Sequence, residues 1–194
     1  LVVSDWGGPL FLTDIGRDTS VARLVICPSE AFDNFPPGLP GKMVWLASRT
    51  TGTIALAQRQ LRVGWLRRRW FMLGQMTKKS VPQEIVEAWT DAALADKRIR
   101  RDLLKYCRTK FVDAELIRAT DRLAGFDGDA LVLWSRNAVM PAEHAERLAA
   151  LLPKARLQYV DDAYVLVMLD NPEATAQAIR AFLAERDIRA GKCE

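Results

Sequence analysis

The chain has 194 residues, of which 49% are hydrophobic and 27% charged, and its formal net charge is +4. This length suffices for one domain, or for one domain with an insertion, that buries a hydrophobic core. No apolar run approaches the roughly 18 residues that a membrane span needs, which argues against a membrane-spanning protein. Because the chain begins at Leu1, already inside an expected strand, we expect it to lack its natural N-terminus.

The cysteines and the histidine limit the chemistry that this chain can perform. Cys27, Cys107 and Cys193 lie far apart without metal-binding spacing. This usage is typical of a reduced, cytoplasmic protein with incidental thiols. His144 is the only histidine, which excludes a multi-histidine metal site. We therefore expect neither a metal nor a cofactor.

The first ten residues predict a strand, a sharp turn and a helix. Leu1–Val3 is a short apolar run, and Asp5, Trp6, Gly7 and Gly8 follow it. Glycines let the backbone turn without a clash, and a side chain at the end of such a strand is presented at the turn. A carboxylate in this place can attack carbon and form an ester intermediate.

The next segments continue a strand and helix pattern. Pro9–Arg17 is expected to form a short helix, and Ala22–Cys27 has the length and β-branched composition of a buried parallel strand. A loop rich in proline and aromatic residues, Pro28 to Gly41, follows.

The region from Lys42 to Phe126 is predicted to be helical, without a convincing strand. Ser80 is an expected N-cap, with Pro82 in the first turn and Gln83 at the capping-box position. The expected helices here are 80–95, 97–108 and 113–123.

Positive charge is concentrated in this helical region, which holds 18 Lys and Arg against 8 Asp and Glu. The charges recur at amphipathic spacing, which favours an ordinary solvated helix face. The alternative is a basic surface that binds an anionic partner. Nothing in the pattern indicates sequence-specific binding of nucleic acid.

Strand and helix alternate again towards the C-terminus. The expected elements are a strand at 130–134, a helix at 141–152, a strand at 156–160 and a helix at 173–185. The pattern predicts an α/β fold, with a parallel sheet, flanking helices and an inserted helical block. The expected parts are core at 1–41, helical cap at 42–126 and core at 127–194.

Several motifs together resemble the α/β-hydrolase family, in particular its haloalkane dehalogenase and epoxide hydrolase group. The quoted motifs are Asp5-Trp6-Gly7-Gly8, the ARLVIC strand at 22–27, Leu131–Trp134 with Val139–Leu148, and 155–157 leading to Asn171–Glu173. The resemblance implies that the chain corresponds to strands five to eight of the family's sheet. It also implies that the preceding strands and the loop of the oxyanion hole belong to a larger protein.

The resemblance implies specific roles for residues of the elbow. Asp5 is the expected nucleophile, and Trp6 is expected to offer its backbone N–H to the oxyanion and its indole N–H to a departing halide. The family's acid is implied either at Asn137, where an amide replaces the carboxylate, or at Glu30 or Asp33 in the second family layout.

The histidine expected of the family is missing. Counting back from Pro172 places Val165 at that position, and a shift of one residue places Tyr164 there. Valine cannot act as a base, and tyrosine, with a pKa of about 10, is a poor one near neutrality. His144 falls in the helix opened by Pro141, where we expect an exposed residue without a catalytic role.

A substrate pocket is expected between the cap and the core. Phe32, Phe35, Tyr164 and Val165 are the expected lining residues, and apolar lining suits a small hydrophobic substrate. Aromatic residues of the cap could line it or pack within the cap; they are Trp45, Trp65, Trp70, Phe71 and Trp89. Tyr106 is the only tyrosine of the cap region, whereas epoxide hydrolases hold the epoxide oxygen with cap tyrosines.

Three hypotheses about function follow from these observations. The first is a hydrolase that acts on a haloalkane, an epoxide or an ester through Asp5. The second is a non-catalytic protein of the same fold that binds a hydrophobic ligand, because the histidine and the acid are both altered. A basic module with an anionic partner is the third and weakest hypothesis.

Overall fold

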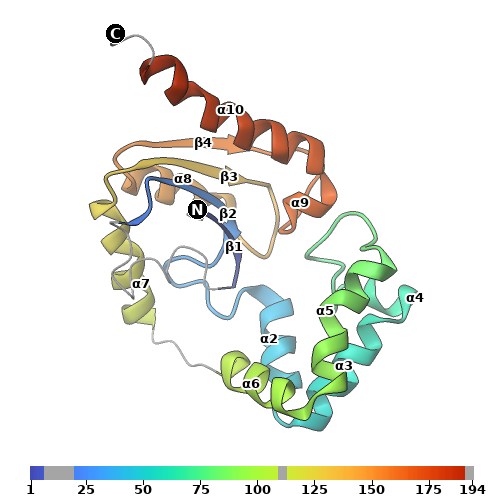
Figure 1. Cartoon of the computed structure of the whole chain (residues 1–194). Coiled ribbons are helices and arrows are strands. Elements are labelled where there is room, and N and C mark those ends of the chain that lie inside the picture. Colours follow the sequence, from blue (N-terminus) through green and yellow to red (C-terminus); the bar gives the residue numbers. More distant parts are fainter. Residues whose placement is uncertain (7–19, 109–112, 191–194) are drawn as a thin grey trace.

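The computed structural model describes residues 1–6, 20–108 and 113–190 of the chain (Figure 1). The helix predicted at 9–17, Gly7, Gly8 and Cys193 lie outside the described residues. No described helix is long and apolar enough to cross a membrane.

A parallel sheet of four strands forms the centre of the fold. Its strands are β1 (Val2–Asp5), β2 (Arg23–Ser29), β3 (Asp129–Trp134) and β4 (Ala155–Tyr159). They lie side by side in the order of the sequence, and every pair is parallel. The predicted α/β class with a parallel sheet is confirmed.

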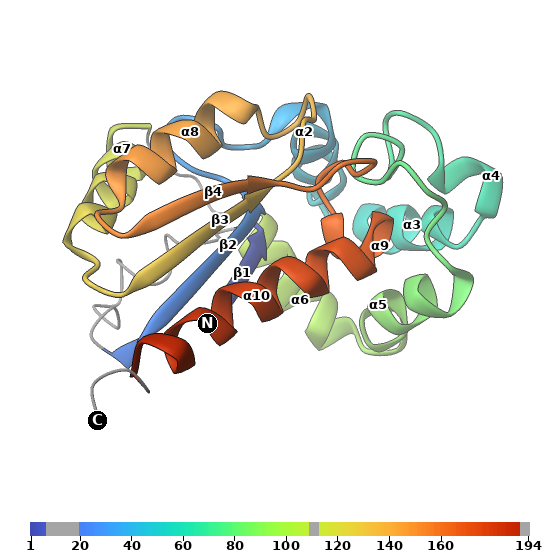
Figure 2. The ribbon, with the colours of Figure 1, turned by 90° about the horizontal axis from the view of Figure 1, so that it is seen from above.

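Apolar residues alternate between the two faces of the sheet, so both faces are buried. Ile26 and Val132 pack on one face against α8 (Ala142–Leu151), where Leu148 is fully buried. Leu133 faces the other side and packs against α10 (Pro172–Ala190), which contributes residues such as Phe182. Figure 2 shows the sheet between these two helices. Burial on both faces explains the continuous apolar strands in the sequence.

A group of helices extends beyond the carboxyl ends of the strands (Figures 1 and 2). They are α2 (Gly38–Ala47), α3 (Thr51–Leu61), α4 (Gly64–Arg67), α5 (Gln83–Ala95) and α6 (Lys97–Cys107). The chain then returns to the sheet through α7 (Asp113–Asp121) and the 3-10 helix η2 (Arg122–Gly125), and α9 (Val167–Asp170) precedes α10. The helical block thus begins at Gly38, ahead of the boundary expected at Lys42.

The helix starts differ from prediction at one place. Ser80 does not cap α5, which begins at Gln83 with Pro82 at the N-cap position and no side-chain cap. The physical reason is that a residue before proline, here Val81, is disfavoured in the helical region, so the helix cannot begin at Ser80. By contrast, the carboxylate of Asp96 accepts the backbone N–H of Arg98 at 2.7 Å and caps α6.

Candidate active site

The end of β1 carries a backbone outlier at Asp5. Its φ angle is +58°, in the left-handed region that residues with a Cβ seldom adopt. The pairing with β2 also shifts between Val3 and Asp5, so that Asp5 lies opposite Ser29. Such a conformation costs about 1–3 kcal/mol and persists where the surrounding structure imposes it. The outlier falls on the residue that the sequence identified as the nucleophile.

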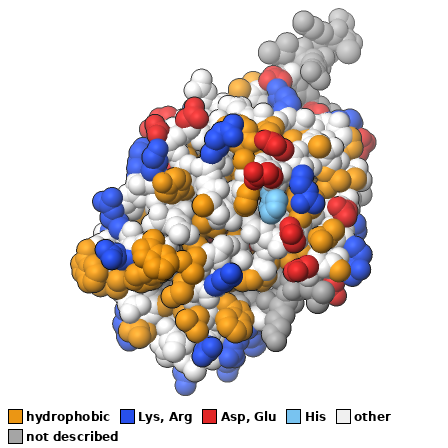
Figure 3. Space-filling view, turned by 180° about the vertical axis from the view of Figure 1, so that it is seen from behind, with side chains coloured by type: hydrophobic (Ala, Val, Ile, Leu, Met, Phe, Trp, Pro, Cys, Tyr) orange, Lys and Arg blue, Asp and Glu red, His pale blue; other side chains and the backbone are white. Residues whose placement is uncertain are grey.

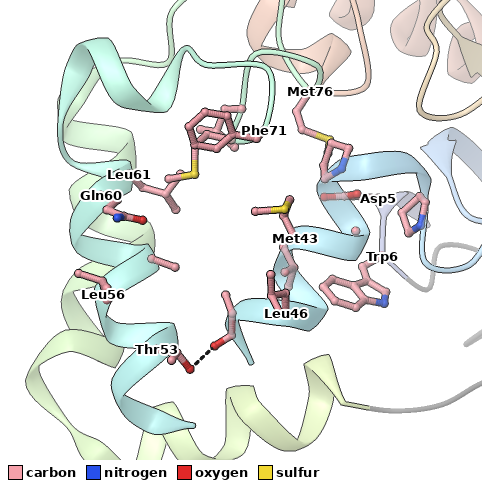
Figure 4. Close-up of a pocket in the computed structure, with 18 of the residues that line it drawn as sticks. Asp5, Trp6, Met43, Leu46, Thr53, Leu56, Gln60, Leu61, Phe71 and Met76 are labelled. Atoms are coloured by element: carbon pink, nitrogen blue, oxygen red, sulfur yellow. Dashed lines mark hydrogen bonds between the residues drawn. The ribbon is translucent and has the colours of Figure 1, made fainter. Parts of the chain in front are cut away.

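Asp5 and Trp6 form one side of a cavity of about 550 Å³ (Figure 4). Helices α2 and α3 and the segment 71–76 provide most of the remaining lining. In Figure 4, Leu56 and Leu61 of α3 lie across the cavity from Asp5. The apolar lining residues include Met43, Val44, Leu46, Leu56, Ala57, Leu61, Phe71, Met72 and Met76. An apolar cavity with a few polar groups is the common form of a site for a small ligand.

Burial governs the electrostatics of Asp5. No described residue donates a hydrogen bond to its carboxylate, and desolvation raises the pKa of Asp5 to about 6. The carboxylate is therefore mostly ionised at pH 7 and above, yet it lacks stabilising partners among the described residues. A poorly solvated carboxylate is more reactive as a nucleophile than one held in hydrogen bonds.

Glu30 is the second carboxylate in the lining of the cavity. It follows β2 directly and is 1% exposed. Because β1 and β2 are parallel neighbours, Asp5 and Glu30 extend from adjacent strand ends. Of the positions that the family resemblance implies for the acid, Glu30, which follows β2, lines the cavity.

The other implied acid position, Asn137, does not line this cavity. Its Oδ1 accepts the backbone N–H groups of Val139 at 3.1 Å and Met140 at 2.7 Å, and its Nδ2 donates to Ser135. These bonds shape the turn after β3, which is a frequent use of asparagine. The described contacts of Asn137 are structural.

Trp6, at the end of β1, packs against helix α6. Its ring centroid lies 5.3 Å from that of Tyr106 and 5.7 Å from that of Phe35. The Tyr106 hydroxyl donates a hydrogen bond of 3.0 Å to the Trp6 carbonyl. Burial raises the pKa of Tyr106 to about 12, and the Glu30 and Asp5 carboxylates add to this shift. Tyr106 therefore stays protonated. It packs against Trp6 but does not line the cavity.

The loop after β4 packs against the core and against α9. Val165 is fully buried in the core between the sheet and α8, and Ser135 Oγ donates to the Tyr164 carbonyl at 2.5 Å. The Tyr164 backbone N–H donates to Asp170 at 2.9 Å. Neither Tyr164 nor Val165 is among the residues that line the cavity.

Phe32 and Phe35 also lie outside the lining of the cavity. Phe32 is 3% exposed in the core, and the guanidinium carbon of Arg147 lies 3.7 Å from its ring centroid. Phe35 packs against Trp6. The lining comes mostly from α2, α3 and the segment 71–76; of the aromatic candidates in the helical region, Phe71 lines the cavity, whereas the lining residues of α2 and α3 were not predicted. In the sequence, the composition of α2 could have indicated a lining helix, because this helix is almost entirely apolar although it lies outside the sheet.

His144 does not reach the cavity. Its Nε2 lies 3.8 Å from Asp33 Oδ1, and its ring packs edge-on against Phe32. Burial lowers the pKa of His144, and Asp33 opposes that shift. No histidine of this chain is therefore placed to activate water beside Asp5. The described residues also contain no group of three or more His, Cys, Asp and Glu side chains that could hold a metal ion.

The comparison with known proteins agrees with this architecture. Residues 1–178 match the alpha/beta hydrolase family, and the chain belongs to that family. Among solved structures, a 2-hydroxy-6-oxo-6-phenylhexa-2,4-dienoate hydrolase from Rhodococcus is similar, with a TM-score of 0.67 and 17% identity over 94% of this chain and 63% of its own. An esterase from Exiguobacterium antarcticum gives a TM-score of 0.63 and 15% identity over 95% of this chain and 66% of its own.

One curated protein is also similar in sequence. It is the dihydrolipoyllysine-residue acetyltransferase component of an acetoin cleaving system from Pseudomonas putida, with 28% identity over 55% of this chain and 31% of its own length. The chain thus spans about a third of this relative and about 63% of the Rhodococcus hydrolase. At these identities, the structural likeness establishes the fold.

Proposed function

We propose that the chain carries the nucleophile and the apolar pocket of a hydrolase that acts on small hydrophobic electrophiles, such as haloalkanes, epoxides or esters. One observation carries the proposal: Asp5 stands at the end of β1 with φ +58° and lines an apolar cavity. A strained turn that presents a poorly solvated carboxylate to an apolar cavity is suited to attack on carbon.

The first step is displacement by Asp5. A carboxylate oxygen forms a bond to the electrophilic carbon, and the halide or alkoxide leaves with the electron pair of the broken bond. With an ester substrate, the carboxylate attacks the carbonyl carbon, the alkoxide leaves with the electron pair of the broken C–O bond, and Asp5 carries a mixed anhydride that water hydrolyses faster than an ester. The Trp6 backbone N–H and indole N–H are the proposed donors for the developing negative charge.

The second step is hydrolysis of the Asp5 ester by water. Glu30 is the other carboxylate in the described lining, so it is the group that accepts the proton of the attacking water. A carboxylate is ordinarily a weaker base than the histidine that the family uses. The ester is therefore expected to form faster than it is hydrolysed, and to accumulate.

The test is the intact mass of the protein after incubation with 1-bromobutane, styrene oxide and phenyl acetate in turn. We expect a persistent adduct that maps to Asp5. Asp5→Asn should give no adduct while folding normally, and Glu30→Gln should form the adduct and retain it about tenfold longer. An adduct on Asp5→Asn at the rate of the unchanged protein would exclude Asp5 as the nucleophile.

Non-catalytic binding of a hydrophobic ligand is the second candidate function. The specific observation in its favour is the loop after β4, where Val165 and Tyr164 replace the expected base and pack away from the cavity. This function predicts saturable binding of apolar compounds without any adduct or product. The mass experiment therefore separates it from the hydrolase proposal.

A further inference from the structure

A second, smaller cavity of about 160 Å³ lies between the α4 region and the segment before α5. Four cationic side chains line it, namely Arg67, Arg68, Lys78 and Lys79, together with Thr77, Ser80 and Tyr164. No carboxylate belongs to its described lining, which distinguishes it from the cavity beside Asp5. Figure 3 shows Lys and Arg side chains among hydrophobic ones along the left edge, where α4 lies when Figure 1 is seen from behind.

Arg67 is the unusual member of this cluster, because its side chain is buried. The residue is 7% exposed, and a buried guanidinium ordinarily needs a carboxylate or several acceptors. Its Nη1 donates to Gln83 Oε1, whereas its Nε is buried without a hydrogen-bond partner. Among the described residues, no carboxylate forms an ion pair with Arg67. Within the described part of the chain, the buried positive charge of Arg67 therefore has no carboxylate to neutralise it.

The two sides of the cavity are held together by backbone contacts. The Leu73 N–H donates to the Arg67 carbonyl at 2.9 Å, and the Gly74 N–H donates to the Arg69 carbonyl at 3.1 Å. A Cβ at Gly74 would overlap the Arg68 carbonyl oxygen, so only glycine allows this close approach. The close turn at 67–74 thus places the buried Arg67 and the exposed Arg68 at the edge of the cavity, across from the exposed Lys78 and Lys79.

Two carboxylates, Asp162 and Asp170, lie near the four cationic residues, so the cluster keeps a net positive charge. Asp162 pairs with Lys78, with 2.6 Å between Nζ and Oδ1. The buried carboxylate of Asp170 accepts the backbone N–H groups of Lys78 and Lys79, each at 2.8 Å. These backbone groups are therefore occupied, and an anion in the cavity would be held by side chains, chiefly those of Arg67, Arg68 and Lys79.

We propose that this cavity is a binding site for a phosphate group, either as inorganic phosphate or as a phosphate monoester. Guanidinium and ammonium groups converge on a small space, and arginine matches the geometry of phosphate oxygens. Leu73 lines both this cavity and the apolar one beside Asp5. A monoester with an apolar chain could therefore place its phosphate here and its chain towards the larger cavity.

The test is calorimetric titration of the chain with inorganic phosphate at low ionic strength. We expect saturable binding of one phosphate per chain. The double variant Arg68→Gln/Lys79→Gln should weaken binding about tenfold, because it removes two of the exposed cations without disturbing the buried Arg67. The matched control is Lys97→Gln/Arg101→Gln, which removes the same charge from exposed positions of α6 and should change the affinity by less than about twofold.

Hexyl phosphate distinguishes the two sources of the phosphate group. Binding about tenfold tighter than that of inorganic phosphate would identify the site as one for an amphiphilic monoester, whereas equal binding would identify it as a site for the free ion. Either result supports the site. The proposal is overturned if no saturable binding occurs, or if the control double variant loses as much affinity as Arg68→Gln/Lys79→Gln. The phosphate site does not depend on the chemistry of Asp5, so Asp5→Asn should bind phosphate unchanged.

Discussion

Asp5 bears two separate energetic costs in the folded state. Its backbone is in the left-handed region, and its carboxylate is desolvated without a hydrogen-bond donor among the described residues. Each effect destabilises the native state by an amount that an ordinary turn residue would not impose. Costs of this kind are characteristic of residues selected for reactivity, because a relaxed, solvated aspartate would be a poorer nucleophile.

The desolvation of Asp5 predicts a pH-dependent change in stability. Burial raises its pKa from 3.8 to about 6, so the folded state holds its proton more tightly than the unfolded state does. The unfolded chain loses the proton first as pH rises, and stability therefore falls between about pH 4 and pH 6 and stays low above that range. Asparagine carries no charge at any pH. Asp5→Asn should accordingly raise the free energy of unfolding by about 2 kcal/mol at pH 8, after allowance for partial exposure of the side chain.

This prediction is checked by urea unfolding of both proteins across pH 3.5 to 8. The difference between them should shrink steadily as pH falls below about 6 and become small near pH 3.5, where aspartate is mostly protonated in both states. A constant difference at all pH values would show that the effect of the substitution is not electrostatic.

At the scale of elements, Asp170 connects segments that are far apart in the sequence. It is fully buried at the end of α9, and its carboxylate accepts three backbone N–H groups, those of Lys78, Lys79 and Tyr164. The Leu166 N–H adds a bond of 3.0 Å to the Met76 carbonyl. The segment before α5 is thereby attached to the loop after β4. Residues of this segment line both cavities, with Met76 in the larger one and Lys78 and Lys79 in the smaller one.

Removal of the Asp170 carboxylate should destabilise the attachment between the segment before α5 and the loop after β4. Asp170→Asn retains one acceptor oxygen but places an NH2 group against N–H donors, so we expect a loss of about 2–4 kcal/mol in the free energy of unfolding. Hydrogen exchange should quicken at the amides of Lys78 and Lys79 first. The exposed Asp161 is a matched control, and Asp161→Asn should change stability by less than about 0.5 kcal/mol. Equal stability of the two variants would show that the three bonds contribute little.

At the scale of the whole molecule, the strand ends and helices α2 and α3 each supply part of the cavity. The sheet places Asp5 and Glu30 at adjacent strand ends, and α2 and α3 supply the apolar wall opposite them (Figure 4). Neither part contains the site alone. A ligand in the cavity therefore contacts the strand ends and helices α2 and α3 together. Its binding should stabilise the packing of these helices against the sheet.

Filling the cavity should weaken the binding of apolar compounds. The double variant Met43→Trp/Leu61→Trp adds bulk to two lining residues, whereas Ile99→Trp/Ile117→Trp adds the same side chains at exposed positions of α6 and α7. We expect N-phenyl-1-naphthylamine to bind the unchanged protein at a single site and to bind the first variant about fivefold more weakly. Its fluorescence enhancement measures the affinity. Equal loss in the second variant would mean that the dye binds the exposed apolar surface instead.

The sequence by itself determined the sheet and the elbow. Apolar runs such as 130–134 fix buried parallel strands through local composition, and β3 and β4 lie within a residue of their predicted positions. Asp5 and Trp6, predicted from the local pattern of a carboxylate between a short strand and two glycines, lie at the end of β1 and line the cavity; their chemical roles remain predictions. Such features depend on neighbours in the chain, and a single sequence carries them.

Only the tertiary structure decided which residues face the cavity. Val165 and Phe32 are apolar and lie near the expected site in sequence, yet they pack into the core because the sheet and α8 need that volume filled. Glu30 reaches the cavity while Asn137 stays in a turn, and Arg67 is buried where its guanidinium donates to Gln83. Which residues face the cavity and which are buried depends on how whole strands and helices pack against one another, and no local pattern expresses those energies.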